Sequence, residues 1–127
     1  MAVLCPDVGE RELLDDMLNA RDRTLKLFKT NVTPAEGDTT GSYTEADFTN
    51  YVAKTLTGAS WNAASTSSGT TSKTYAQQSW TCGASGNTVY GAYYVRSTTL
   101  CAVDQFAVAR VLADTDVLNF TPRWELA

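Results

Sequence analysis

Carboxylates at short spacing are the residues of this sequence that come nearest to a catalytic pattern. Glu45 and Asp47 are two residues apart in a segment predicted to be extended, so their side chains point to the same side. By spacing alone they could form the carboxylate pair of a glycosidase, whose members lie about 5 to 10 Å apart. Asp114 and Asp116 have the same spacing, but a calcium loop needs a third acid and a glycine. The second pair therefore predicts a turn.

Other common catalytic groups are missing from the sequence. It contains no histidine, which removes Ser–His and Cys–His nucleophiles and most zinc sites. Cys5, Cys82 and Cys101 are odd in number, and none belongs to a C-x-x-C pair. They predict buried thiols, with a disulfide between Cys82 and Cys101 as the open alternative. The sequence therefore predicts a protein that is not an enzyme and that binds no cofactor or metal.

Length and charge set the class of protein. The 127 residues are predicted to form a single domain, 1–127. The net charge is −4 and the ten cationic residues are scattered, which argues against nucleic acid or an anionic membrane as partner, because both favour clustered cations. No segment approaches the roughly twenty apolar residues of a membrane span, and the N-terminus lacks the pattern of a signal peptide.

One N-terminal helix is predicted from about residue 8 to 21. Asp7 and Glu10 have the spacing of a capping box with Asp7 as the cap. Apolar residues then recur at helical spacing and form one stripe, made of Leu13, Leu14, Met17 and Leu18. Asp15 and Asp16 are predicted to face solvent, since adjacent helical side chains point about 100° apart and cannot converge.

After the helix the pattern changes to short segments of period two. We predict seven or eight strands separated by turns, including a strand of about six residues near Leu25 and one or two within residues 43–57. The Ser/Thr/Gly-rich segment around Trp61 is predicted to be a turn region. The pattern is typical of antiparallel sheets in a β-sandwich or jelly roll, with one N-terminal helix.

The stretch GNTVYGAYYV, residues 86–95, holds three tyrosines. In a strand from Thr88 to Val95, Val89, Gly91, Tyr93 and Val95 lie on one face, and Tyr90, Ala92 and Tyr94 lie on the other. Neither face is polar, which favours a central strand covered on both sides. A subunit contact through one face and a platform that stacks on a sugar or base are the alternatives.

Four stretches, in this order, resemble a family of small structural proteins encoded in tailed-bacteriophage genomes: LKLFKTNVTPAEGDT, YTEADFTNYVAKTL, YAQQSWTCGASGNTVYGAYYV and FAVARVLADTDVLNFTPRWEL. The resemblance covers about Leu25 to Leu126. It implies a virion component, and within that class a capsid decoration (cement) protein is the preferred role. A neck, tail or baseplate component is the alternative, and a glycan-binding module is a competing class.

The resemblance also implies partners. We expect the other virion proteins, above all the major capsid protein, and a homo-oligomer, with a trimer as the assumed state. Aromatic residues suit such contacts because they cover much area at little conformational cost. The candidate subunit-contact residues are Trp61, Trp124, Tyr90 and Tyr94. Each tryptophan could equally be a core residue.

Overall fold

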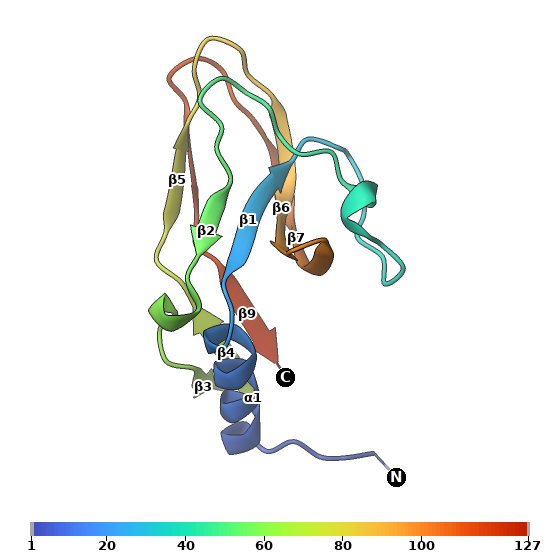
Figure 1. Ribbon diagram of the computed structural model, residues 1–127, viewed down its shortest axis with the longest axis vertical. Helices are drawn as coiled ribbons and strands as arrows, with labels where there is room; N and C mark the ends of the chain where they lie inside the picture. The colour runs from blue at the N-terminus through green and yellow to red at the C-terminus, as the bar shows by residue number, and fades with distance from the viewer. Residues whose placement is uncertain (1, 127) are drawn as a thin grey trace. The chain divides into compact units, whose positions relative to one another are not determined.

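The computed structural model describes residues 2–126 and shows a mainly-β protein with one N-terminal helix (Figure 1). The prediction of a mainly-β fold with antiparallel sheets and one helix is confirmed. The chain forms two compact units, each assembled from separate segments. Unit 1 comprises residues 1–22, 56–78 and 120–127, and unit 2 comprises residues 23–55 and 79–119. The prediction of a single domain, 1–127, stays a prediction.

Unit 1 contains the helix and a small sheet. Helix α1 (Asp7–Asn19) lies beside the hairpin of β3 (Ser65–Ser67) and β4 (Thr70–Thr74), and β4 also pairs with β9 (Arg123–Leu126) in an antiparallel sheet of order β3-β4-β9 (Figure 1). A short 3-10 helix, η2 (Gly58–Ser60), also contacts α1. An alanine at Gly58 would place its Cβ 2.6 Å from the Asn19 carbonyl oxygen, so only glycine fits there.

The helix is where it was predicted, but its details differ. Pro6 is the N-cap and makes no side-chain capping bond, so the predicted Asp7 capping box is wrong. Glu10 instead turns its carboxylate towards β4. Of the predicted apolar stripe, Leu14 and Leu18 are buried, whereas Leu13 and Met17 are exposed.

The hairpin of β3 and β4 falls where a turn region was predicted. Its strands carry only serine, threonine and lysine, so the apolar alternation that marks a strand is absent. Ser68 and Gly69 join the strands with φ of 50° and 77°. Positive φ at both central residues is the mark of a type I′ turn, which matches the twist of paired strands.

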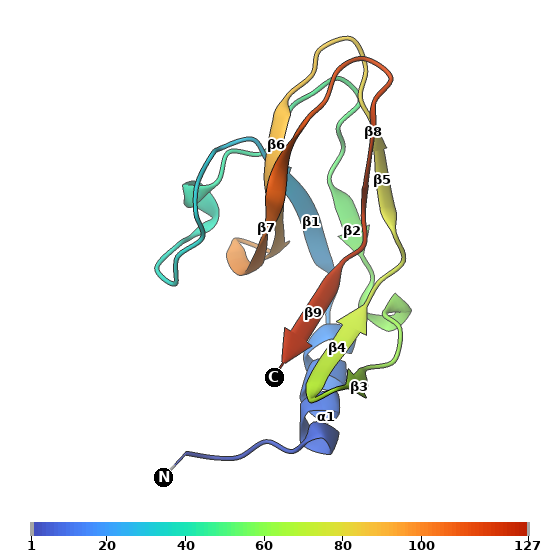
Figure 2. The same ribbon diagram turned by 180° about the vertical axis from the view of Figure 1, so that it is seen from behind.

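Unit 2 holds the larger sheet, of order β2-β1-β6-β7, and a two-stranded sheet of β5 and β8 (Figure 2). The strands are β1 (Arg23–Phe28), β2 (Lys54–Leu56), β5 (Gln78–Thr81), β6 (Thr88–Arg96), β7 (Thr99–Val111) and β8 (Val117–Phe120). The last residue of β2 and of β8, and the first of β5, belong to unit 1. Within residues 43–57, β2 is the only strand that the structure describes besides one isolated bridge of Glu45.

Strand β6 is central, as predicted for the tyrosine-rich stretch. It pairs antiparallel with β1 on one side and with β7 on the other, and its residues from Gly91 to Val95 are all buried. An alanine at Gly91 would place its Cβ 2.3 Å from the Asp104 carbonyl oxygen, so β7 approaches β6 too closely there for any other residue.

The register of β6 and β7 shifts between Val89 and Gly91, where residues 106–109 of β7 lie opposite Tyr90 alone. Tyr90 packs against the aromatic cluster that contains Tyr93, not on the opposite face with Ala92 as predicted. The prediction assumed strict alternation, which a bulge interrupts.

Candidate functional site

The four predicted contact residues differ in how much surface they offer. Trp61 is 6% exposed and Tyr94 is 1% exposed, so both fill the interior and leave little area for a partner. Trp61 packs edge-on against Tyr75, with ring centroids 5.2 Å apart. Tyr90 and Trp124 are half-buried. Their role as contact residues stays a prediction, whereas for Trp61 and Tyr94 the burial agrees with the core alternative.

An aromatic cluster covers one face of the larger sheet. Phe28, Tyr43, Tyr93 and Val95 are its buried members. The Tyr43 ring lies 4.9 Å from that of Phe28 and stacks on that of Tyr93 at 5.5 Å, measured between centroids. Burial raises the pKa of both tyrosines to about 12. These rings act as packing elements and stay protonated at neutral pH.

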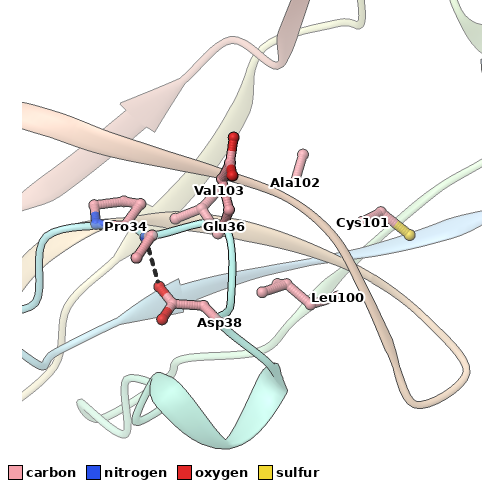
Figure 3. A pocket seen from close by; sticks show the side chains of 8 residues that line it. Pro34, Glu36, Asp38, Leu100, Cys101, Ala102 and Val103 are labelled. Carbon is pink, nitrogen blue, oxygen red and sulfur yellow. Dashed lines mark hydrogen bonds between the residues drawn. The ribbon is translucent and has the colours of Figure 1, made fainter.

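A hollow of about 400 Å³ lies between the loop at residues 34–38 and the start of β7, where Leu100 and Val103 line it (Figure 3). Glu36 and Asp38 are the acidic residues that line it, and the loop already uses the Asp38 carboxylate. Its Oδ2 accepts hydrogen bonds from the Tyr43 hydroxyl at 2.5 Å and the Ala35 N–H at 2.9 Å. The bond from Tyr43, followed by that from Ala35, holds the pKa of Asp38 below its ordinary value. Asp38 therefore fixes the loop.

The carboxylates that could have formed a glycosidase pair are each bound to a different lysine. Glu45 lies 3.2 Å from the Lys26 ammonium and accepts a hydrogen bond from the Tyr51 hydroxyl at 2.8 Å. Asp47 accepts one from Lys29 at 2.7 Å, and this bond is the main reason why the pKa of Asp47 is lowered. A glycosidase acid needs a raised pKa to remain protonated. The geometry assigns both carboxylates to ion pairs that tie loop residues to β1 and the segment after it.

Asp114 and Asp116 form the predicted turn. Asp116 accepts a hydrogen bond from the Ala113 N–H at 2.9 Å, and Thr115 has a φ of 72°. The neighbouring Cys82 is buried, and burial raises the pKa of its thiol. Cys82 and Cys101 are both free thiols. Within residues 2–126, no group of three or more His, Cys, Asp or Glu could hold a metal ion.

Sequence reasoning missed a polar network between α1 and the hairpin. Glu10 accepts a hydrogen bond from the Thr71 hydroxyl at 2.8 Å. Thr71 and Thr66 share a hydrogen bond between their hydroxyl oxygens at 2.8 Å, and Arg11 donates to Thr66 at 2.8 Å. Both Glu10 and Thr71 are buried. Buried polar groups are stable only when hydrogen-bonded, so this chain of bonds fixes the helix on the sheet.

A second polar contact lies beside it. The ammonium of Lys73, which is buried on β4, donates to Asp15 of α1, and Asp15 also accepts the Ala64 N–H at 3.2 Å. The hydrogen bond from Lys73 is the main reason why the pKa of Asp15 is lowered. The Asp15 side chain is 40% exposed, so it does reach solvent as predicted, but its ion pair with Lys73 was not predicted.

Several large apolar side chains are exposed at the surface. Apolar side chains are exposed on the N-terminal segment, at Val3 and Leu4, and on strand β7, at Val108 and Val111.

No helix within residues 2–126 is both long and apolar enough to cross a membrane. Comparison with protein-family models, with curated proteins and with solved structures finds no match.

Proposed function

We propose that the protein is a non-enzymatic structural component of a tailed-bacteriophage virion, acting as a capsid decoration protein. The resemblance of the four stretches is the reason for placing it in a virion. The observation that supports a role in assembly is the exposure of large apolar side chains. Val3 and Leu4 are 95% and 87% exposed, and contiguous apolar residues at a surface are typical of sites that pack against another protein.

A decoration protein acts by linkage. It binds the assembled shell and lowers the free energy of that state by the binding free energy summed over many sites. This role needs a rigid scaffold and contact area rather than a pocket. The buried aromatic cluster and the polar network of α1 supply rigidity in unit 2 and unit 1 respectively. The expected partners are the major capsid protein and further copies of the chain.

The burial of aromatic rings counts against the glycan-binding alternative. A lectin-like site stacks a sugar on an exposed ring, and both Trp61 and Tyr94 are buried. A neck or tail component needs the same kind of scaffold as a decoration protein. The two virion roles differ in copy number and location, so an experiment on virions must separate them.

The test is quantitative peptide mass spectrometry on purified virions separated into heads and tails. Peptides of the major capsid protein and of the tail tube serve as internal standards for the two fractions. We expect the chain in heads at a copy number comparable to that of the major capsid protein. About a dozen copies confined to necks or tails, as expected for a closed ring of subunits, would replace the decoration role by the connector role. Absence from virions would overturn both.

A binding assay tests the contact surface itself. Heads prepared without the protein are mixed with purified chain, and bound protein is measured by sedimentation. If the N-terminal segment contacts the shell, the double variant Val3→Asp, Leu4→Asp binds at least about tenfold more weakly. Val52→Asp is the matched control, because Val52 is also exposed but lies elsewhere in the chain. Equal binding by all three proteins would exclude the segment as a contact.

A further inference from the structure

The hollow beside strand β7 has acidic side chains on one wall and apolar side chains on the other (Figure 3). Glu36 and Asp38 belong to the loop at residues 34–38, whereas Leu100 and Val103 belong to β7. None of the described residues that line the hollow is basic. The hollow therefore presents two carboxylates next to an apolar surface, and its lining contains no cation to neutralise them.

The aromatic cluster holds the acidic wall in place. Asp38 accepts hydrogen bonds from the Tyr43 hydroxyl and the Ala35 N–H, and the Asp38 N–H donates to the Ala35 carbonyl at 3.0 Å. Tyr43 is itself buried in the cluster, where it stacks on Tyr93. These bonds close a turn that contains Glu36. A turn that is already formed loses little conformational freedom when a ligand binds to it.

Glu36 is the acidic side chain of this turn that has no partner. It is exposed, and it makes no hydrogen bond or ion pair with any described residue. Asp38 keeps its negative charge at neutral pH, because its hydrogen bonds from Tyr43 and Ala35 hold its pKa below the ordinary value. Both carboxylates favour a cation. A guanidinium fits best, since it can donate two parallel hydrogen bonds to the two oxygens of Glu36.

The apolar wall continues the core of unit 2 to the surface. Leu100 and Val103 pack against the aromatic cluster and are only half-buried. Their register partners on β6, Val95 and Tyr93, are buried members of that cluster. The aliphatic stem of an arginine can lie on such a surface while its charged end reaches a carboxylate. The two walls together therefore complement an arginine side chain along its whole length.

The volume and the opening of the hollow favour an arginine that belongs to a protein. The hollow measures about 400 Å³ and is open to solvent, whereas a site for a free small molecule encloses most of the surface of its ligand. A protein segment that carries an arginine covers the open side with its neighbouring residues. An apolar neighbour would contact the part of Leu100 and Val103 that the arginine stem leaves exposed.

We propose that this hollow is a docking site for an arginine of a partner protein, with an apolar residue next to the arginine in the partner's sequence. Glu36 binds the guanidinium, and Asp38 fixes the loop and adds its charge. Leu100 and Val103 contact the arginine stem and the apolar neighbour. The proposal does not rest on the virion role, because it is argued from the hollow alone and is tested on the purified chain.

The experiment is an NMR titration of the isotope-labelled chain with the peptide acetyl-Leu-Arg-Leu-amide. We expect saturable shifts of the amide signals of residues 35–38 and 100–103, with a dissociation constant of about 1 mM. Acetyl-Leu-citrulline-Leu-amide has nearly the same shape without the charge, and it is expected to bind at least about tenfold more weakly. Acetyl-Gly-Arg-Gly-amide lacks the apolar neighbours, and it is expected to bind about threefold more weakly or worse.

Two acidic positions provide a matched pair of variants. Glu36→Gln keeps the size of an exposed side chain and removes its charge, so it should raise the dissociation constant of the Leu-Arg-Leu peptide about tenfold without unfolding the chain. Asp104→Asn is the control and should leave binding unchanged, because Asp104 is an exposed acid of β7 that does not line the hollow.

Four results would contradict the proposal. The absence of shifts up to about 20 mM peptide would exclude the site. Equal binding of the citrulline peptide, or unchanged binding by Glu36→Gln, would overturn the role of the charge. Equal binding of the Gly-Arg-Gly peptide would overturn the role of the apolar wall. None of these results bears on whether the chain occurs in virions, so the two proposals fail separately.

Discussion

Replacing Asp15 by alanine would leave the ammonium of Lys73 without its counter-ion. The Lys73 side chain is 0% exposed, whereas that of Asp15 is 40% exposed. Asp15 also accepts the Ala64 N–H. The two members of this ion pair are therefore unequal: water can solvate a lone Asp15, but it cannot reach a lone Lys73 without disrupting unit 1.

The magnitude follows from this inequality. Removing one partner of a buried ion pair costs about 3 to 5 kcal/mol, and we expect about 3 for Asp15→Ala, because the pair is partly open to water. Lys73→Met removes the buried charge and keeps the apolar stem, so it should stay within about 1 kcal/mol of the wild type. In the double variant no buried charge is left unpaired. It should be about 2 kcal/mol more stable than Asp15→Ala alone, despite the lost hydrogen bond of Ala64.

Urea denaturation followed by the helical circular dichroism signal measures these differences, because α1 belongs to the same unit as Lys73. We expect Asp15→Ala to be much less stable than Lys73→Met. If Lys73→Met were the more damaging change, or if adding it to Asp15→Ala lowered stability further, the ammonium would not be a buried charge that depends on Asp15.

Further expected outcomes concern pH, glycine positions and ligands. The folded state holds the pKa of Asp15 below its ordinary value, so on acidification Asp15 binds a proton in the unfolded chain first. The stabilisation from Asp15 is therefore present above about pH 4 and is lost as the pH falls through the folded pKa. Asp15→Ala should flatten this part of a stability–pH profile. Gly91→Ala is expected to lower the free energy of unfolding, measured by urea denaturation, by about 2 kcal/mol, because the alanine Cβ would contact the β7 backbone and the Phe28 ring. Gly37→Ala is the control and should leave stability unchanged, because a Cβ at Gly37 has nothing within 4 Å. Gly69→Ala should cost about 1 kcal/mol, because its φ of 77° is unfavourable for any residue with a Cβ; an unchanged midpoint would mean that the turn adopts another conformation. Tryptophan fluorescence should not shift on adding saccharides, and a reproducible, saturable shift would revive the glycan-binding alternative.

Apolar periodicity in the sequence predicts much of the fold. The helix was predictable because Leu14 and Leu18 recur at helical spacing, and both are buried. Strand β6 was predictable because residues 89–95 are apolar on both faces, which suits only a strand covered on both sides. Bulges are less visible in sequence, since they depend on how a neighbouring strand approaches. The face of Tyr90 was therefore mispredicted.

The candidate site could be predicted only in part. Aromatic residues were singled out as candidate contact residues, but sequence alone does not say whether such a ring packs inside its own chain or on its surface. Burial of Trp61 and Tyr94 required the surrounding strands to be in place. The edge position of β7 is likewise a property of strand order, which local residue patterns do not encode.

Residue patterns are enough to predict the type of element wherever apolar side chains mark the buried face: the helix, the central strand and the mainly-β class. The polar side of unit 1, in contrast, depends on contacts that exist only in the folded chain. Strand β4 turns Thr71 and Lys73 inwards, and no periodicity rule predicts that a lysine will be buried. Thr71 and Lys73 can be buried only because α1 places Glu10 and Asp15 next to them as hydrogen-bond and ion-pair partners. A buried polar group is stable when a partner far away in the chain satisfies it, and that partner exists only once the chain has folded.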